Sequence, residues 1–267
     1  MGISYLDTHC HLDMLSDPES QILNASKKGV DKIIVPAVDR NNFFIVKEMA
    51  SKFENVFYSL GIHPCRVNQV SSDDLLFLDN LLSASSTDPK LVAIGEIGLD
   101  FFLKNLDKGK MEKIYIQQLK LAKKFSLPVL LHVRKSQDLI LKYFKMSGVN
   151  SGIAHAFNGS NIQAKNFIKN GLLLGFGGAM TYERSLQIRR LATNIPDNAF
   201  VIETDSPDLS PSWRRKGQEN SPAEIPLIAS CLASLRGVST EKIATLNYTN
   251  AIRALPKLSL YARYKSI

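Results

Sequence analysis

The sequence predicts an α/β fold, a single (β/α)8 barrel. Short apolar runs rich in β-branched residues alternate eight times with longer amphipathic stretches, which indicates parallel strands joined by crossover helices. Eight such units in about 250 residues are typical of a closed barrel. The main alternative, an open doubly wound sheet, usually carries a Gly-x-Gly-x-x-Gly motif after its first strand, and this sequence has none there.

The expected strands are short, apolar and bounded by turn residues. In chain order they are Tyr5–His11, Lys32–Val38, Val56–His63, Val92–Gly98, Pro128–Arg134, Gly152–Phe157, Leu172–Phe176 and Phe200–Asp205. The expected helices between them include Glu19–Lys28, Asn41–Phe53, Lys110–Phe125 and Ser136–Met146. In the third of these, Tyr115, Leu119 and Ala122 stand at positions i, i+4 and i+7, which is helical spacing.

The C-terminal part of the chain is expected to complete the barrel. The eighth strand leads into Pro207-Asp208-Leu209-Ser210-Pro211, a loop rich in turn residues. Two further helices, Ala223–Leu235 and Thr240–Leu255, would then close the outer ring. No linker, low-complexity tract or sequence repeat divides the chain, so we expect one domain over residues 1–267.

Composition indicates a soluble globular chain with an uneven charge distribution. Apolar residues make up 45% and charged residues 22%, whereas disorder needs fewer apolar residues and more charge. The net charge is +8, with 8 Lys/Arg against 13 Asp/Glu in residues 1–98 and 25 against 12 in residues 99–267. This asymmetry indicates an anionic partner, with nucleic acid the first candidate, although a solvated lysine-rich surface is the plainer explanation of charge alone.

Several classes of protein are excluded by what the sequence lacks. No apolar run approaches the ~18 residues that span a bilayer, so we expect no membrane association. The first residues show neither the basic nor the apolar region of a secretory signal. Three cysteines without a Cys-x-x-Cys pair fit a reducing cytoplasm and argue against a thiolate zinc site. We therefore expect a cytoplasmic location, and we infer no stable protein partner.

Polar side chains, whose burial costs free energy, interrupt the apolar strands near their C-terminal ends. The active sites of barrels are built at this end. His9 and His11 end the first expected strand and, two residues apart, would project together. The others are Glu96 in the fourth strand, His132 in the fifth, His155 in the sixth, and Glu203 and Asp205 in the eighth. A lone histidine in a strand is more often a satisfied core residue, but so many polar groups at one rim need a shared partner. A metal cluster supplies that partner.

The types of ligand restrict the metal. Imidazole and carboxylate groups without thiolate suit zinc, manganese, iron or magnesium. Four histidines and two carboxylates are too many for one tetrahedral ion but suit two ions that share a bridge. Glu96, a carboxylate borne on a middle strand, is the natural bridge. Two such ions can activate a shared hydroxide and hold a phosphoryl oxygen.

Six ordered motifs lie between Asp7 and Pro207. They are Asp7-Thr8-His9-Cys10-His11-Leu12-Asp13, Gly61-Ile62-His63-Pro64, Gly95-Glu96-Ile97-Gly98-Leu99-Asp100, Leu127-Pro128-Val129-Leu130-Leu131-His132-Val133-Arg134, His155-Ala156-Phe157-Asn158-Gly159 and Glu203-Thr204-Asp205-Ser206-Pro207. Together they resemble the successive signatures of the TatD family of metal-dependent deoxyribonucleases, which are barrel hydrolases of the amidohydrolase-like group. The resemblance covers the chain from Leu6 to about Arg253. Phe101 and Asn220-Ser221-Pro222 depart from the family pattern, which leaves the substrate preference open.

The resemblance implies a site of two divalent ions, Mg²⁺, Mn²⁺ or Zn²⁺. The implied ligands are His9, His11 and Asp205 for the first ion, His132 and His155 for the second, and Glu96 as the bridge. Asp205 would also orient the hydroxide and handle its proton, so Asp205 and Glu96 are the expected catalytic residues.

Three further residues are expected beside the ions. His63 would contact the scissile phosphate, with a role in orienting a ligand as its alternative. Arg134, two residues beyond His132, would contact a phosphate, with a salt bridge as its alternative. Glu203 would hydrogen-bond a ligand, or else form a paired structural carboxylate. Arg214-Arg215-Lys216 would steer a polyanion, although such a run is more often only solvated surface.

The expected function is metal-dependent hydrolysis of ester bonds, and DNA is the favoured substrate and partner. If the mouth of the barrel admits only the ends of DNA strands, the enzyme would remove nucleotides from the 3′ end. One alternative is hydrolysis of another ester or amide, such as aminoacyl-tRNA or a small cyclic amide. Glu96 stands where many barrel amidohydrolases carry a modified lysine, which favours the nuclease. A non-catalytic nucleic-acid-binding scaffold is the other alternative, and the presence of every expected ligand type argues against it.

Overall fold

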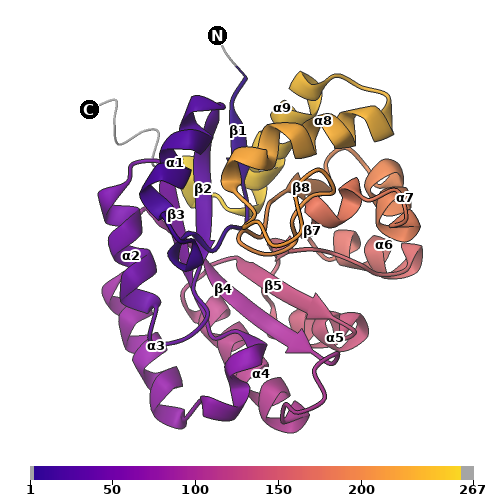
Figure 1. The fold of residues 1–267 in the computed structure, drawn as a ribbon. Coiled ribbons are helices and arrows are strands. Elements are labelled where there is room, and N and C mark those ends of the chain that lie inside the picture. The colour runs from indigo at the N-terminus through magenta and orange to yellow at the C-terminus, as the bar shows by residue number, and fades with distance from the viewer. Residues whose placement is uncertain (1–2, 260–267) are drawn as a thin grey trace.

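The structure is a computed structural model that describes residues 3–259. Within these residues, eight parallel strands follow one another in sheet order and helices surround them (Figure 1). The strands are β1 (Tyr5–Asp7), β2 (Val30–Pro36), β3 (Val56–Leu60), β4 (Leu91–Asp100), β5 (Val129–Arg134), β6 (Gly152–Ala154), β7 (Leu172–Phe176) and β8 (Phe200–Ile202). The predicted (β/α)8 barrel is confirmed.

Helices occupy the segments between successive strands. They are α1 (Pro18–Lys27), α2 (Phe43–Lys52), α3 (Ser72–Ala84), α4 (Lys108–Lys124), α5 (Gln137–Ser147), α6 (Asn161–Lys169) and α7 (Leu186–Asn194). Helices α8 (Ile225–Arg236) and α9 (Thr240–Ala254) follow β8. Four 3-10 turns, η1 (Leu12–Met14), η2 (Pro64–Gln69), η3 (Gly178–Thr181) and η4 (Pro222–Glu224), follow β1, β3, β7 and β8. Among residues 3–259, none of the helices has the length and apolar character needed to cross a bilayer.

Local chemistry explains where several helices begin and end. Ser160 and Gln163 form a reciprocal capping box at the start of α6, which satisfies two backbone N–H groups that have no partner within the helix. Gly148 and Gly237 end α5 and α8 in the left-handed conformation, with φ of 73° and 65°. Glycine adopts this conformation without the steric cost that a Cβ would bring.

The strands separate two apolar layers. Along β2, Ile33 and Val35 belong to the layer that packs against the surrounding helices, whereas Ile34 belongs to a second layer. The second layer takes at least one residue from each strand and, apart from α9 and the residues that follow it, contains no helical residue that is fully buried. It is therefore the interior of the barrel, and the alternation of side chains along each strand explains the division.

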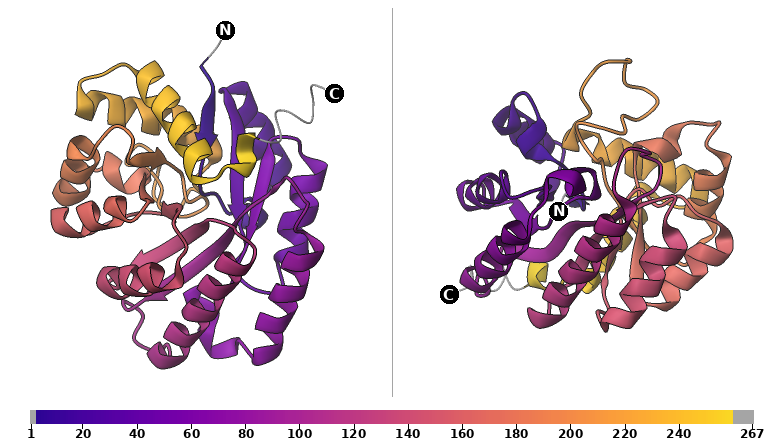
Figure 2. Two further views of the ribbon diagram at one scale, coloured as in Figure 1. Left: turned by 180° about the vertical axis from the view of Figure 1, so that it is seen from behind. Right: turned by 90° about the horizontal axis from the view of Figure 1, so that it is seen from below.

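Helix α9 closes the N-terminal end of the barrel, which corrects the prediction that both final helices join the outer ring. Ala251 and Ala254 of α9, together with Leu255 and Leu258 beyond it, pack against the interior layer. Helix α8 does join the ring, beside α7. Figure 2 shows α9, in yellow, next to β1. An apolar helix face suits either position, so helical spacing alone did not distinguish them.

The barrel closes at a seam between β1 and β8, which form no ladder with each other in the described sheet. On the N-terminal side, Asn247 of α9 bridges the seam, since its Nδ2 donates to Leu6 O and its Oδ1 accepts from Ile202 N, both at 2.8 Å. On the C-terminal side the backbone closes the seam directly, because Asp205 N donates to His9 O at 2.8 Å.

Five strands end earlier than predicted. The expected ends were His11, Val38, His63, Phe157 and Asp205, whereas β1, β2, β3, β6 and β8 end at Asp7, Pro36, Leu60, Ala154 and Ile202. Ala156 and Asp205 adopt left-handed backbone conformations, with φ of 43° and 54°, which no β-strand contains. His9, His11, His155 and Asp205 therefore lie on loops beyond the strand ends, whereas Glu96 and His132 lie within β4 and β5.

Candidate metal centre

The carboxylate of Glu96 lies between two pairs of histidines. Its Oε2 is 3.2 Å from His9 Nε2 and 3.5 Å from His11 Nε2. Its Oε1 is 2.9 Å from both His132 Nδ1 and His155 Nε2. Burial alone would raise the pKa of Glu96, but the surrounding histidines outweigh this and hold the pKa well below its usual range. Glu96 is thus an ionised carboxylate whose two oxygens face two separate ligand groups.

Asp205 approaches the first histidine pair from the other side. Its Oδ1 lies 3.5 Å from His9 Nε2 and 3.6 Å from His11 Nε2. The side chain of Asp205 is 14% exposed, whereas that of Glu96 is 2% exposed. Of these two carboxylates, Asp205 is therefore the one that water can reach.

The nitrogen and oxygen atoms of this cluster are better arranged to bind a cation than to form hydrogen bonds with one another. His9 Nε2 and His11 Nε2 are 3.3 Å apart, and Nδ1 of His9, His11 and His155 has no hydrogen-bond partner among the described residues. Burial alone would lower the pKa of His155, but Glu96, Asp205 and Glu203 outweigh it and raise this pKa to about 10. A site that favours positive charge so strongly, lined by imidazole and carboxylate, suits a divalent metal ion.

His63 lies within the same cluster. It precedes η2, and its Nε2 is 3.0 Å from His132 Nδ1 and 3.4 Å from Glu96 Oε1. Burial lowers the pKa of His63 to about 4, so the ring is neutral. The backbone N–H of Cys65 donates to His63 Nδ1, and because a backbone N–H can only donate, the ring proton lies on Nε2. His63 therefore presents an N–H donor to the site, which suits its predicted contact with a phosphate oxygen.

Asp100 lies behind His132 and was not among the predicted site residues. Its Oδ2 is 3.2 Å from His132 Nε2, and its Oδ1 accepts from Phe102 N at 2.9 Å. This contact holds the ring proton of His132 on Nε2, so the Nδ1 lone pair is directed into the site, where it faces His63 and Glu96 and could bind a metal ion. The sequence did contain a signal, because Asp100 follows Glu96 by four residues in one strand and residues four apart share a face.

Asp7 is a second residue that the prediction missed. It is fully buried beneath the centre and accepts from Thr204 Oγ1 at 2.6 Å, Thr204 N at 3.0 Å and His9 N at 3.2 Å. Burial raises the pKa of Asp7 to about 8. Asp7 thereby connects the segment of His9 to the segment of Asp205. These segments are distant in the sequence, so no local sequence pattern predicts this contact.

Glu203 lies behind His155. Its Oε1 accepts a hydrogen bond from Ala156 N and is 3.7 Å from His155 Nδ1. Glu203 and Asp205 do not lie on a strand as predicted, because β8 ends before both, and Asp205 has a left-handed backbone with φ of 54°. Gly175 leaves room for Glu203, since a Cβ there would lie 2.2 Å from Glu203 Oε2.

Arg134 lies at the end of β5 with half of its side chain exposed. Its Nη1 is 3.7 Å from Asp100 Oδ2, and its guanidinium carbon is 3.9 Å from the centre of the Phe102 ring. Asp100 is thus the partner that the salt-bridge alternative requires. The exposed part of the Arg134 guanidinium can still contact a phosphate.

Relatives in sequence agree with this geometry. Residues 6–256 match the family described as TatD related DNase. YjjV of Escherichia coli, described as an uncharacterized metal-dependent hydrolase, is 35% identical over 259 residues that cover 94% of this chain and 98% of that protein. A Haemophilus influenzae protein with the same description is 37% identical over 258 residues that cover 92% and 97%.

Solved structures agree as well. The crystal structure of E. coli YjjV, described as a TatD homologue, matches with a TM-score of 0.91 at 33% identity and covers 96% of this chain and 99% of that one. A TatD family hydrolase from Entamoeba histolytica matches with a TM-score of 0.83 at 24% identity over 96% and 99%, which shows a shared fold. The chain therefore belongs to the TatD family and is a metal-dependent hydrolase.

Proposed function

We propose that this protein hydrolyses phosphodiester bonds of DNA at a centre of two divalent cations, Mg²⁺, Mn²⁺ or Zn²⁺. The observation that carries the proposal is the position of Glu96, whose two carboxylate oxygens face different histidine pairs. A bound pair of cations on such a bridge activates water and offsets the charge of a phosphoryl group. The family's description as DNase-related favours a phosphodiester among possible esters.

The distances are compatible with two ligand groups. His9, His11 and Asp205 would hold one cation, His132 and His155 would hold the other, and Glu96 would contact both. Asp100 keeps the Nδ1 lone pair of His132 directed into the site. Glu203 supports the ring of His155 from behind.

The chain's own groups handle the proton and the phosphate. Asp205 accepts a proton from the attacking water, because it is the more exposed carboxylate and burial raises its pKa. His63 Nε2–H donates to a non-bridging oxygen, where charge builds up as water attacks phosphorus. The bond from phosphorus to the leaving oxygen then breaks, and this oxygen takes up the proton that Asp205 accepted. Arg134 binds a neighbouring phosphate through the exposed part of its guanidinium.

The test compares three substrates under identical conditions. Metal-stripped protein receives Mg²⁺, Mn²⁺ or Zn²⁺ together with end-labelled single-stranded DNA, aminoacyl-tRNA or a dihydropyrimidine amide. We expect metal-dependent cleavage of the DNA, with products shortened from the 3′ end, and loss of this cleavage in Glu96→Ala.

Two results would overturn the proposal. One is the absence of DNA cleavage with every ion, and the other is DNA cleavage that persists in Glu96→Ala, which would indicate a contaminating nuclease. Hydrolysis of only the aminoacyl ester or only the amide would assign the same centre to a different substrate.

A further inference from the structure

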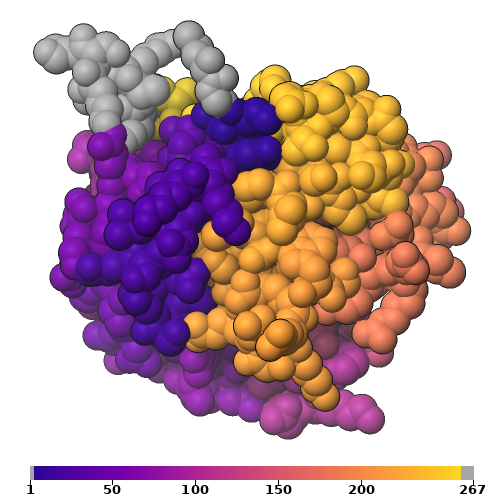
Figure 3. Space-filling view, turned by 45° about the horizontal axis from the view of Figure 1, so that its top comes forward, coloured from indigo at the N-terminus to yellow at the C-terminus, as the bar shows by residue number. Residues whose placement is uncertain are grey.

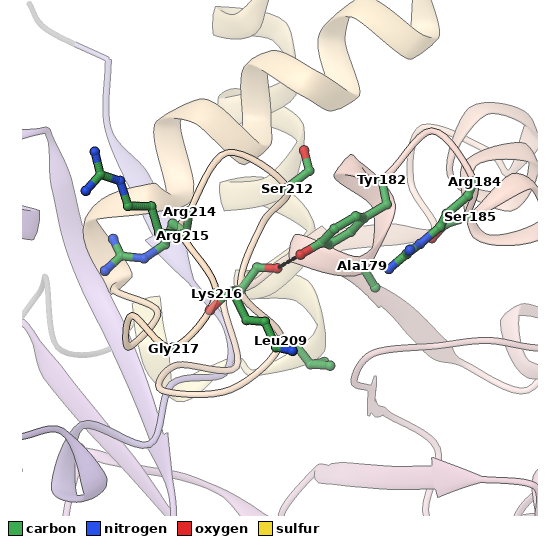
Figure 4. Close-up of a pocket in the computed structure, with 11 residues that line it drawn as sticks. Ala179, Tyr182, Arg184, Ser185, Leu209, Ser212, Arg214, Arg215, Lys216 and Gly217 are labelled. Carbon is green, nitrogen blue, oxygen red and sulfur yellow. Dashed lines mark hydrogen bonds between the residues drawn. The ribbon is translucent and has the colours of Figure 1, made fainter.

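A cavity of about 680 Å³ lies between two loops at the C-terminal end of the barrel. Residues 179–185, from η3 to the start of α7, line one side, and residues 209–217, after β8, line the other (Figure 4). We call it the basic cleft. Its volume is within the range of about 300–1,000 Å³ that is usual for ligand pockets. Figure 3 shows the loop after β8, in orange, at the surface of the molecule.

The basic cleft is fixed relative to the metal centre. The loop that forms one wall begins directly after the predicted ligand Asp205. Asn220 anchors this loop, since its Nδ2 donates to Thr204 O at 2.7 Å and to Asp208 O at 2.9 Å. Just before the other wall, a Cβ at Gly177 would lie 2.7 Å from Glu203 O and one at Gly178 would lie 1.9 Å from Leu209 O, so the segments that follow β7 and β8 pack closely together.

Three cations of the basic cleft have no ion-pair partner within residues 3–259. Arg184, Arg215 and Lys216 are exposed and form no ion pair there, whereas Arg214 is held by Glu224, with Nη1 2.8 Å from Oε1. The run at 214–216 is thus divided, with one arginine structural and its two neighbours free. Unpaired cations around a cavity attract a polyanion.

None of the described acidic side chains of the same loops forms an ion pair with these three cations. Glu183 and Asp208 are exposed, and neither forms an ion pair with a described cation. Glu219 is turned away, because it accepts from Ser16 Oγ at 2.7 Å. The cleft therefore keeps its free cations for a ligand.

Tyr182 supplies an aromatic surface between the two groups of cations. Its hydroxyl donates to Ser210 O at 3.1 Å, which fixes the ring across the cleft. In Figure 4, Arg184 lies on one side of Tyr182, and Arg215 and Lys216 lie on the other. Sites for single-stranded nucleic acids combine such cations, which follow the phosphates, with aromatic rings on which bases stack.

We propose that the basic cleft binds the part of a DNA single strand that adjoins the scissile bond. Arg184, Arg215 and Lys216 contact its phosphates, and Tyr182 stacks with a base. This inference rests on the proposed nuclease function, and it gives a role to three of the 25 Lys and Arg residues in the stretch 99–267.

Binding is measured separately from cleavage. The probe is a fluorescein-labelled oligothymidylate of about twelve nucleotides, within the site sizes of single-strand binders, and its anisotropy is followed with EDTA present. In the triple variant R184Q/R215Q/K216Q we expect Kd to rise about tenfold or more, and the slope of log K against log salt to fall by about 2, because each lost phosphate contact removes about 0.7. Tyr182→Leu should raise Kd about tenfold with an unchanged salt slope, since it removes stacking but no charge.

The matched control removes the same charge elsewhere. Lys120, Lys145 and Lys165 are exposed lysines on α4, α5 and α6, and their triple change to glutamine should leave both Kd and slope within about twofold. Equal effects of the two triple variants, or no effect of the cleft variants, would overturn the inference. Metal content and Tm check that the cleft variants fold, and Arg184→Gln alone replaces the triple variant if it does not.

The outcomes separate this inference from the proposed function. Wild-type protein that binds the oligothymidylate through the cleft but cleaves no DNA contradicts only the nuclease proposal. Wild-type protein that cleaves DNA while the cleft variants bind as tightly as it does contradicts only the cleft.

Discussion

The two ends of this barrel are closed in opposite ways. At the C-terminal end, strands stop early and loops bring histidines and carboxylates into a buried cluster around Glu96. At the N-terminal end, α9 covers an apolar interior with small and aliphatic side chains such as Ala251 and Leu255. Burying polar groups at the C-terminal end of the barrel costs free energy. The close-packed apolar core at the N-terminal end supplies compensating stability.

The seam between β1 and β8 runs from the N-terminal end of the barrel to its C-terminal end, and it is closed differently at the two ends. Near α9, one amide side chain, Asn247, satisfies a carbonyl of β1 and an N–H of β8. Near the metal centre, the loops that carry His9 and Asp205 bond to each other directly, and Asp7 holds them together from below. We therefore expect changes at the C-terminal end to alter metal binding and catalysis, and changes at the N-terminal end to alter stability.

The largest effect is expected from Glu96→Gln. It preserves shape but removes the charge that faces both histidine pairs, so kcat/KM should fall by about a thousandfold or more and metal content should fall with it. Metal analysis and DNA cleavage measure the two losses. As a control, Glu48→Gln at an exposed position of α2 should lower neither kcat/KM nor metal content. An unchanged metal content in Glu96→Gln would contradict the bridging position.

At the opposite end, Asn247→Ala should lower the free energy of unfolding by about 3 kcal/mol. The change leaves one buried carbonyl and one buried N–H of the seam without partners, at about 1–3 kcal/mol each. Urea denaturation measures the loss. At a temperature where the variant remains folded, its kcat/KM should match that of the wild type, and a large loss of activity there would show that the two ends are coupled.

A smaller effect is expected behind the metal centre, from Asp100→Asn. An asparagine amide would donate to His132 Nε2 and move the ring proton to Nδ1, which must instead face the cation. Metal affinity should fall by about 10- to 100-fold. Titration with a chelator measures this, and Asp73→Asn on the surface of α3 serves as the control. Unchanged affinity would mean that Asp100 is only structural.

The smallest effect is expected from Arg134→Gln at the rim. If its guanidinium contacts a phosphate, KM for DNA should rise by about fivefold while kcat and metal content stay unchanged. The half-exposed pair with Asp100 contributes less than about 1 kcal/mol to stability, so Tm should hardly move. A fall in metal affinity with constant KM would instead support the salt-bridge alternative.

The predicted ligands could be recognised from the sequence because polar residues in apolar strands are conspicuous wherever the chain later places them. His9, His11, Glu96, His132, His155 and Asp205 do lie together in the structure. The strand-face argument behind several of them was less sound, since β1 and β8 end before His9 and Asp205. Loops bring His9, His11, His155 and Asp205 into range, whereas Glu96 and His132 project from β4 and β5.

By itself the sequence determined the eightfold alternation, the chemical types of the ligands and the order in which they occur. Only the tertiary structure decided which nitrogen faces which oxygen, that Asp100 and Asp7 support the ligands, and that α9 covers the barrel's N-terminal end. The reason is physical: periodicity records how a side chain points relative to its own strand or helix. The distances between elements depend instead on barrel closure and on contacts such as that between Asn247 and Leu6, which are 241 residues apart.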